Sequence, residues 1–416
     1  MKKKWISMLL ALSMVSALAA CGKDTTGDGD TTLPSLNSEP ISTSDGQTTE
    51  GQVTADTSSS ENLTTVSGLS DVKTILVRSD VDGLKQSYLT GEWKSSSVVN
   101  RRPMAVMVPN NAAALPQYGI GNASIIYEAP MEYGSCTRLM CVFEDYDDLD
   151  YILPIRSSRL YFLKEAMSLD AIYCNWGLAV AYVSETINSD RVDNISAAVS
   201  GISDPSDEAY YRDEDRKAAG YATEYTGALD IEGYQQAVER HGYETNYRER
   251  FIQSFAFADD MIITYDEYPD VNVLRPSGST DKIANGYSNC MPEFIYNPED
   301  RLYYRYEYKE AQVDARTGEQ LAVTNVIFKF VYEEYLDDNG YLSLETRGWG
   351  DAAVFTSGKY IPATWTAGTD DNDPTYYWTE DGDEIVLNQG KTWVCLIGSD
   401  FSYATSFIYD ENATLY

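Results

Sequence analysis

Histidine is nearly absent from this sequence, because His241 is the only one among 416 residues. A Ser-His-Asp triad, a Cys-His pair or a histidine-based zinc site would each need that single residue. His241 ends the stretch that begins at Gln235 and is followed by Gly242, a pattern typical of a helix closed by glycine. We therefore expect His241 to cap a helix, and most histidine-dependent catalysis is excluded.

Cysteines are few and do not suggest a disulfide framework. Of the six, Cys21 stands apart near the N-terminus, which leaves an odd number in the rest of the chain. Cys136 and Cys141 lie five positions apart in a predicted strand, so they point to opposite faces and cannot pair within it. We expect mainly buried thiols at the remaining positions, Cys136, Cys141, Cys174, Cys290 and Cys395.

Recognisable cofactor and metal motifs are also missing. The sequence has no Walker A loop, no paired CxxC motif and no EF-hand loop. We therefore expect neither a cofactor nor a bound metal.

Basic residues are scarce, with 31 Lys and Arg against 65 Asp and Glu and a formal net charge of −34. The negative field keeps the chain soluble and repels polyanions within the screening length. Nucleic acid is therefore not an expected partner. Anionic lipid headgroups or wall polymers would be attracted only by a local basic patch.

An apolar run near the N-terminus follows three lysines. Lys2–Lys4 precede Trp5–Leu18, and two alanines come before Cys21. This layout is typical of a secretory signal peptide, and the run is shorter than the roughly 20 residues that a membrane-spanning helix needs. Leu18–Cys21 resembles a bacterial lipobox, although a signal peptide with an incidental cysteine is the alternative. The resemblance implies a cleaved signal peptide over 1–20 and a lipid on Cys21 that holds the protein at the outer face of the cytoplasmic membrane.

Aromatic residues are missing between Gly22 and Asp71, where Thr, Ser, Gly, Asp and Glu dominate. A segment of this composition cannot bury a core, so we expect the lipidated cysteine to be followed by a disordered linker over 21–85. The rest of the chain is long enough for two domains. We expect an α+β N-terminal domain at 86–270 and a β-rich C-terminal domain at 271–416.

Hydrophobic periodicity predicts the elements of these domains. Helices are expected at 177–187 and 230–241, and a further helix is expected directly after Ser157 or Ser158, either of which could cap it. A mixture of strands and helices followed by a run of strands indicates an α+β fold. Strands are expected at 104–108, 123–128, 136–143, 171–174, 294–296, 302–309, 323–331, 352–355, 384–387 and 392–397.

Ordered motifs give the chain a family resemblance over most of residues 100 to 398. They are Arg102–Asn111, Ala123–Glu128, Glu132–Gly134, Thr137–Arg138, Pro154–Phe162, Val313–Ala315, Thr324–Val326, Gly348–Gly350 and Gly390–Trp393. Together they resemble the YerB-like lipoproteins of Gram-positive type bacteria. The resemblance implies an α+β fold, with a three-layer β-β-α sandwich-like main domain and a β-rich C-terminal part. It implies no established reaction.

Two segments depart from the family pattern. Asn175–Gly177 stands where a His-x-Gly is usual, and Ala219–Tyr221 stands where a Pro-His-Asn-like segment is expected. A site that depended on those histidines could not operate here in the same way.

Charged and polar side chains gather near predicted strand ends and the start of a helix. Arg156 and Arg159 lie three apart there, so they could hold a carboxylate or phosphate together with free backbone N–H groups. The ligand would be an anionic cell-wall fragment, such as one from peptidoglycan, or a carboxylate on a partner protein. The alternative is that the glutamates and arginines only pair with one another. The candidate binding residues are Glu128, Glu132, Arg138, Arg156, Ser157, Arg159 and Asn175.

Two broader functions remain open. Glu128 and Glu132 could form the carboxylate pair of an enzyme that cleaves cell-wall glycan. A non-catalytic envelope module that binds or scaffolds a cell-wall assembly protein agrees better with the lack of histidine, metal and cofactor motifs. Its contact surface could include aromatic residues, which core packing would explain equally well: Trp349, Tyr360, Trp365, Tyr376, Tyr377 and Trp378.

Overall fold

The structure of the chain is a computed structural model that describes residues 64–69, 80–197, 208–276, 286–413 and 415. They belong to one compact unit, Ser59–Tyr416. The expected signal peptide, Cys21 and most of the expected linker lie outside the described residues.

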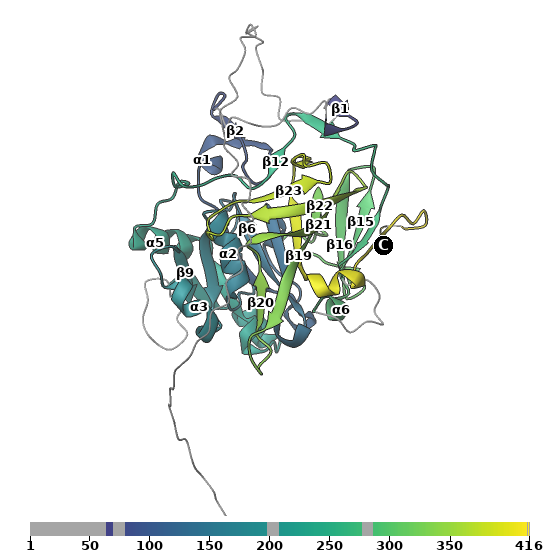
Figure 1. Ribbon diagram of the computed structural model, residues 1–416. Helices are drawn as coiled ribbons and strands as arrows, with labels where there is room; N and C mark the ends of the chain where they lie inside the picture. Colours follow the sequence, from purple (N-terminus) through teal and green to yellow (C-terminus); the bar gives the residue numbers. More distant parts are fainter. Residues whose placement is uncertain (1–63, 70–79, 198–207, 277–285, 414, 416) are drawn as a thin grey trace, which may run out of the picture. The chain divides into compact units, whose positions relative to one another are not determined.

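One large sheet takes strands from both expected domains (Figure 1). Its central strand, β25, runs parallel to β19 on one side and to β5 on the other. The sheet is therefore continuous across residue 270, and the domain boundary remains a prediction from the sequence. In spatial order the strands are β23 (Thr375–Thr379), β22 (Lys359–Ala367), β21 (Gly348–Thr356), β19 (Asn325–Tyr335), β25 (Thr392–Gly398), β5 (Ile125–Pro130), β6 (Thr137–Phe143), β4 (Met104–Pro109), β8 (Ile172–Trp176) and β9 (Asn194–Ala197), with β20 (Leu342–Glu345) beside β19.

A second sheet comes from the C-terminal half and contains β17 (Glu310–Ala311), β16 (Leu302–Glu307), β15 (Glu293–Asn297), β14 (Val273–Arg275) and β26 (Ser406–Ile408), with β18 (Ala322–Val323) beside β16. Smaller sheets pair β10 (Tyr210–Arg212), β11 (Gly227–Asp230) and β7 (Tyr151–Ile152); β2 (Leu84–Gln86) and β3 (Trp93–Ser95); β12 (Ala256–Phe257) and β24 (Val386–Leu387); and β1 (Thr64–Val66) and β13 (Met261–Ile263).

Helices are short and fewer than strands among the described residues. The α-helices are α1 (Ser96–Val99), α2 (Leu160–Ser168), α3 (Val180–Ile187), α4 (Glu214–Ala218), α5 (Ile231–His241) and α6 (Gly286–Cys290). Short 3-10 turns occur at η3 (Ala112–Ala114), η4 (Ile120–Asn122), η5 (Glu132–Gly134), η7 (Thr223–Tyr225) and η8 (Ser399–Ala404).

The predicted elements occur where the sequence placed them, with ends shifted by a few residues. The strand expected at 323–331 continues to Tyr335 as β19, for example, and the helix expected at 177–187 begins later, at Val180. A mostly sheet structure with few helices confirms the α+β or β-rich class in outline. The three-layer β-β-α arrangement remains a prediction.

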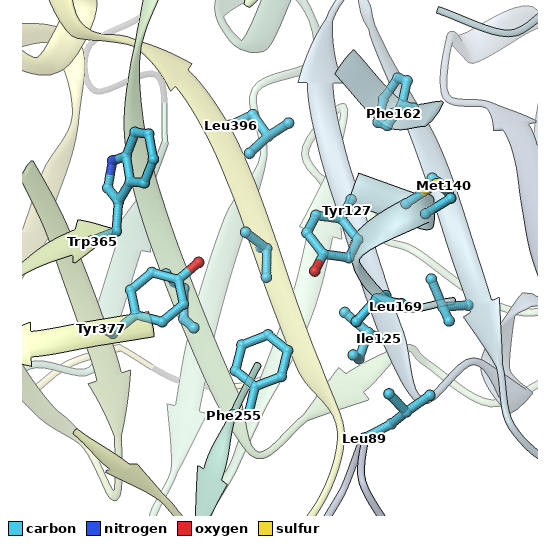
Figure 2. Packing of buried hydrophobic residues seen from close by; sticks show 14 of the residues in the cluster. Leu89, Ile125, Tyr127, Met140, Phe162, Leu169, Phe255, Trp365, Tyr377 and Leu396 are labelled. Atoms are coloured by element: carbon cyan, nitrogen blue, oxygen red, sulfur yellow. The ribbon is translucent and has the colours of Figure 1, made fainter. Parts of the chain in front are cut away.

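Alternation along the central strands separates two apolar cores. In β5, Ile125 and Tyr127 belong to one core and Ile126 to the other, as the period of two in a strand requires. The first core includes Phe162 of α2. In the view of Figure 2, Leu396 lies between the side chains of Phe162 and Trp365. The second core contains residues of α5 and of the second sheet.

His241 ends α5 as expected. Gly242 follows in the left-handed conformation with φ 69°, and its N–H bonds the Glu239 carbonyl in the last turn. The His241 ring stacks on Tyr243, with the ring centroids 5.0 Å apart. The expectation that His241 closes a helix is therefore confirmed.

The cysteines are thiols, and four of the five in the described residues are buried, as expected. Burial raises the pKa of Cys141, Cys174, Cys290 and Cys395 above the usual thiol range. Cys136 is only partly buried and lies just before β6 instead of inside it.

The expected linker contains β1 and the first two residues of β2. Its residues Thr64–Val66 form β1, which pairs in parallel with β13. Backbone hydrogen bonds, which composition does not reveal, order this part of the segment. No helix in the described ranges has the length and apolar character of a membrane span.

A buried charge cluster links α2 to the large sheet. Lys329 of β19 lies with its Nζ 2.8 Å from Glu165 Oε1 of α2, and Arg347 lies 3.3 Å from the same oxygen. Burial opposes ionisation of Glu165, but the two cations hold its pKa below the ordinary value. The cluster fixes a helix of the N-terminal half on a strand of the C-terminal half.

We predict that Lys329→Met lowers the free energy of unfolding by about 3–5 kcal/mol, because it disrupts a charge cluster in the core. Urea denaturation would measure the change. Lys359→Met is the matched control, since Lys359 pairs with Asp270, whose side chain is 67% exposed. Lys359→Met should lower the free energy of unfolding by less than about 1 kcal/mol. Equal losses in the two variants would contradict a structural role for the buried cluster.

Candidate anion-binding site

The expected site residues divide between the two faces of the large sheet. Glu128 of β5 lies opposite Leu139 of β6, and Arg138 of β6 lies opposite Ala129 of β5. Leu139 belongs to the second core and Ala129 to the first. Glu128 and Arg138 therefore point to opposite sides of the sheet.

Glu128 is fully buried in the second core. Its carboxylate lies 3.0 Å from Arg305 of β16 and accepts hydrogen bonds from Trp393 Nε1 at 3.0 Å and Thr137 Oγ1 at 2.8 Å. The Arg305 guanidinium lies over the rings of Trp393 and Phe294. These contacts tie β5 to the second sheet.

Glu307 adds a second buried carboxyl group beside Arg305. Burial raises the pKa of Glu307 well above its usual range; Arg305 opposes this shift, and Glu128 adds to it. Asn110 Nδ2 donates to Glu307 Oε1 at 2.7 Å and to Thr137 Oγ1 at 2.9 Å. One cation between two carboxyl groups favours a proton on Glu307.

This arrangement corrects two expectations for Glu128. It does not pair with Arg138, Arg156 or Arg159, because strand alternation turns it toward Arg305. Nor does it meet Glu132, whose carboxylate pairs with Arg159 beside the first core. The two glutamates thus form no carboxylate pair of the kind that glycoside hydrolysis uses. The pairing expected between the glutamates and the three arginines is found only for Glu132.

The arginines form a cluster at the edge of the sheet where β4 and β8 end. Arg138 is 6% exposed, and its Nη1 donates to the Ser157 carbonyl at 2.8 Å. Its Nε is buried and has no hydrogen-bond partner among the described residues. Burial, Arg159 and Arg156 together hold the pKa of Arg138 below its ordinary value. A nearby anion would stabilise its charged form.

Arg156 and Arg159 come from the loop before α2. Arg159 Nε donates to Glu132 Oε1 at 2.6 Å, and its Nη1 donates to the Ser158 carbonyl at 2.8 Å. Arg156 is partly exposed and lies 3.7 Å from Glu224, with a buried Nε that has no partner in the described part of the chain. Both guanidinium groups lie close enough to Arg138 for their charges to act on it.

Two backbone segments hold the cluster in place. The Trp176 N–H donates to the Arg156 carbonyl at 3.1 Å, and the Ser158 N–H donates to the Gly177 carbonyl at 2.9 Å. Asn175 is fully buried, and its Nδ2 also donates to the Gly177 carbonyl, at 2.7 Å. Asn175 therefore supports the loop that leads into α3 instead of facing the cluster as a direct ligand.

The expectation that Ser157 or Ser158 caps α2 is wrong. Arg159 occupies the N-cap position, and no described side chain caps the helix. The Ser157 hydroxyl donates to the Trp176 carbonyl, while the Ser158 hydroxyl bonds the Tyr173 hydroxyl at 2.9 Å. Hydrogen bonds to β8 take both hydroxyls away from the helix.

The start of α3 is also uncapped by any described side chain. Its N-terminus follows the Trp176–Gly177 segment that is bonded to the loop before α2. Two helices therefore begin beside the arginines, and their first-turn N–H groups add positive potential to the cluster.

Sequence reasoning missed Arg212 of β10 and its partners. The Arg212 guanidinium lies 3.8 Å from the centre of the Trp176 ring. Burial, and to a smaller extent the charge of Arg156, lowers the pKa of Arg212. Arg156 itself lies over the Tyr225 ring. No sequence motif joins residues 156, 176 and 212, which only the fold brings together.

Positive charge exceeds negative charge in this cluster. Among the described residues, the carboxylates paired with Arg138, Arg156, Arg159 and Arg212 are Glu132 and Glu224. Four guanidinium groups with two carboxylate partners form an unbalanced site in a chain of formal charge −34. The arrangement suits a compact anion such as a carboxylate or phosphate group.

The aromatic contact surface expected near the C-terminus is only partly available. Trp365 and Tyr377 are buried, at 1% and 6% exposure, while Trp349 is 80% exposed. The remaining rings, Tyr360, Tyr376 and Trp378, are partly buried.

The structure also contains a cavity of about 710 Å³, which lies away from the arginine cluster. It lies between β16, β18 and the loops beside η4, and it is lined by acidic side chains that include Asp145, Asp148 and Glu319. None of the expected site residues lines it.

A solved structure of similar fold is known. The crystal structure of YerB protein from Bacillus subtilis aligns with a TM-score of 0.63 and 21% sequence identity, over 78% of this chain and 99% of that one. A curated relative from Bacillus subtilis (strain 168), described as "Putative lipoprotein YerB", is 24% identical over 311 residues, which are 74% of this chain and 85% of the relative.

Two family models then identify the chain. They are described as the N-terminal and C-terminal domains of "Protein of unknown function (DUF3048)", and they match residues 89–244 and 283–394. The chain belongs to this family of YerB-like proteins, which confirms the resemblance found in the sequence.

We predict that Glu307→Gln makes the protein relatively more stable than the parent as pH rises. In the unfolded chain the carboxyl group ionises near its usual pKa of about 4.3, whereas burial in the folded protein raises its pKa well above that value. The parent should therefore lose stability as pH rises above that value, and the variant should lack this loss. Urea denaturation between pH 5 and pH 8 would compare them. Glu310→Gln, at an exposed neighbouring position, is the control; parallel profiles for Glu307→Gln and the parent would contradict a protonated Glu307.

Proposed function

We propose that this protein is a lipid-anchored, extracytoplasmic binding module of the cell envelope that captures an anionic group at its arginine cluster. The observation that carries the proposal is Arg138, a buried guanidinium beside Arg156 and Arg159 whose Nε has no hydrogen-bond partner in the part of the chain that the structure describes. A buried cation without a paired anion is costly, and a bound carboxylate or phosphate would remove that cost.

The charge of the whole molecule limits the ligand. A net charge of −34 repels extended polyanions, whereas a short ligand that carries its charge at one point can reach the arginines. Two anions fit this description, a cell-wall fragment such as one from peptidoglycan and a carboxylate on a partner protein. The separation of Glu128 from Glu132 gives no support to the glycan-cleaving alternative.

The location is proposed from the sequence and the family. The signal-like N-terminus and Cys21 indicate export and lipidation, and a relative over most of the chain carries the word lipoprotein in its name. A lipid on Cys21 would keep the module at the outer face of the cytoplasmic membrane. The linker after it would let the arginine cluster search the nearby cell wall.

We predict that the soluble part binds an anionic peptidoglycan fragment, such as a muramyl dipeptide, and that Arg156→Ala weakens binding at least about tenfold. Loss of one charge-assisted contact is worth about 1.5–3 kcal/mol. Isothermal titration calorimetry would measure the affinity, and Arg159→Ala should behave in the same way.

Arg191→Ala is the matched control for this binding test, because Arg191 is partly exposed and pairs with Asp370 and Asp371 away from the cluster. Its affinity should equal that of the parent. Unchanged affinity in both cluster variants would reject the arginine site.

We also predict that Cys21→Ala moves the protein from the membrane fraction to the soluble fraction of intact cells, because the variant lacks the thiol that carries the lipid. Cell fractionation with immunodetection would measure this, and processing of the parent should be sensitive to globomycin. Cys136→Ala serves as the control and should stay with the membrane. A Cys21→Ala protein that remains membrane-bound would refute the lipid anchor.

A further inference from the structure

Two pairs of tyrosines lie beside the arginine cluster. The Arg159 guanidinium lies 5.3 Å from the centre of the Tyr341 ring, and Tyr341 lies 5.4 Å from Tyr182 between ring centroids. Tyr133 follows Glu132, the partner of Arg159, and its ring lies 6.3 Å from that of Tyr335. We call these four tyrosines, Tyr133, Tyr182, Tyr335 and Tyr341, the tyrosine ledge.

The ledge is built from both halves of the chain. The β19–β20 hairpin of the C-terminal half supplies Tyr335 and Tyr341, and η5 and α3 of the N-terminal half supply Tyr133 and Tyr182. The Tyr182 hydroxyl donates to Asp337 Oδ2 of the hairpin turn at 2.8 Å. The hairpin is therefore held next to the arginines by side-chain contacts.

Tyr133 is fixed in an unusual conformation. Its φ is 55°, a region that bulky residues rarely adopt. Its ring packs on Gly340, where an added Cβ would lie 2.6 Å from the ring, and its hydroxyl donates to the Asp338 carbonyl. Strained backbone of this kind is often found at functional sites.

Large parts of the ledge remain open to solvent. Tyr133 is 62% exposed and Tyr335 is 57% exposed. Two exposed rings in contact, next to a charged cluster, offer flat apolar area with polar edges for a ligand.

The charges around the ledge restrict what can lie on it. Glu334 and Asp338 are exposed on the hairpin, and Asp337 is partly exposed. An acidic polymer would be repelled there, whereas an uncharged, hydroxyl-rich ring would find hydrogen-bond acceptors. The ligand therefore needs a negative charge at the arginines and a neutral polar body over the tyrosines.

We infer that the ligand is an anionic saccharide, with its carboxylate or phosphate on the arginine cluster and a sugar ring on the tyrosine ledge. Sugar rings match the ledge because one face is lined by C–H groups and the edges carry hydroxyls. The inference rests on the proposed anion-binding function and adds the chemical class of the ligand.

Calorimetry with the soluble part of the chain tests this inference. Glucuronate should bind more tightly than acetate, and glucose 1-phosphate more tightly than inorganic phosphate, each by about tenfold. The pair with the larger gain would distinguish a carboxylate from a phosphate source. Tyr133→Ala and Tyr335→Ala should each remove most of the extra affinity for the saccharides. Both variants should bind acetate and inorganic phosphate as tightly as the parent does.

Two further variants control for structure. Tyr335→Phe keeps the ring and should keep the gain, which separates ring loss from misfolding. Tyr332→Ala removes a 61% exposed tyrosine that lies beside Glu334 instead of in the ledge, and it should behave like the parent.

The remaining outcomes separate the two proposals. Bare anions that bind as tightly as the saccharides would overturn the inference and keep the anion site. Tighter binding of a peptide with a free carboxyl terminus, such as N-acetyl-phenylalanyl-alanine, would also overturn it. No binding of any anion would reject the proposed function together with the inference.

Discussion

The buried ion pair between Glu128 and Arg305 is the contact on which the arrangement of the two sheets depends. It joins β5, at the centre of the large sheet, to β16 of the second sheet, and both side chains are at most 1% exposed. The charges are held only because Trp393 and Thr137 satisfy the carboxylate and aromatic rings cover the guanidinium. Since a buried charge without its partner is strongly unfavourable, this pair holds the two sheets in one relative position.

Alternation of side chains along β5 and β6 determines which charged groups lie on the opposite face of the large sheet. Arg138 on the neighbouring strand points to the other face of the sheet from Glu128, forms no ion pair within the described part of the chain, and lies near Arg156 and Arg159. Glu132 forms its ion pair with Arg159. Glu128 therefore balances Arg305 on one face of the sheet, and among the described residues the arginines on the other face keep an excess of positive charge.

The β19–β20 hairpin joins the two halves of the chain next to the proposed site. The β19–β20 turn of the C-terminal half is held against the N-terminal half through Tyr133 and through the hydroxyl of Tyr182. Family models match both halves as separate domains, yet the strands form one sheet and the side chains meet at one site. The proposed binding site requires both halves, because neither half alone supplies the arginines and all four tyrosines of the ledge.

The sequence alone determined the family, the α+β or β-rich class, most strands and helices, and the closure of a helix at His241. These follow from local periodicity, capping residues and ordered motifs, which act over short stretches of chain. Only the tertiary structure decided the partner of Glu128, the inclusion of Arg212 and the contact of Tyr133 with the hairpin. Those contacts join residues more than 30 positions apart. Which face of a strand meets which neighbour depends on the order of strands in the sheet, which no local pattern records.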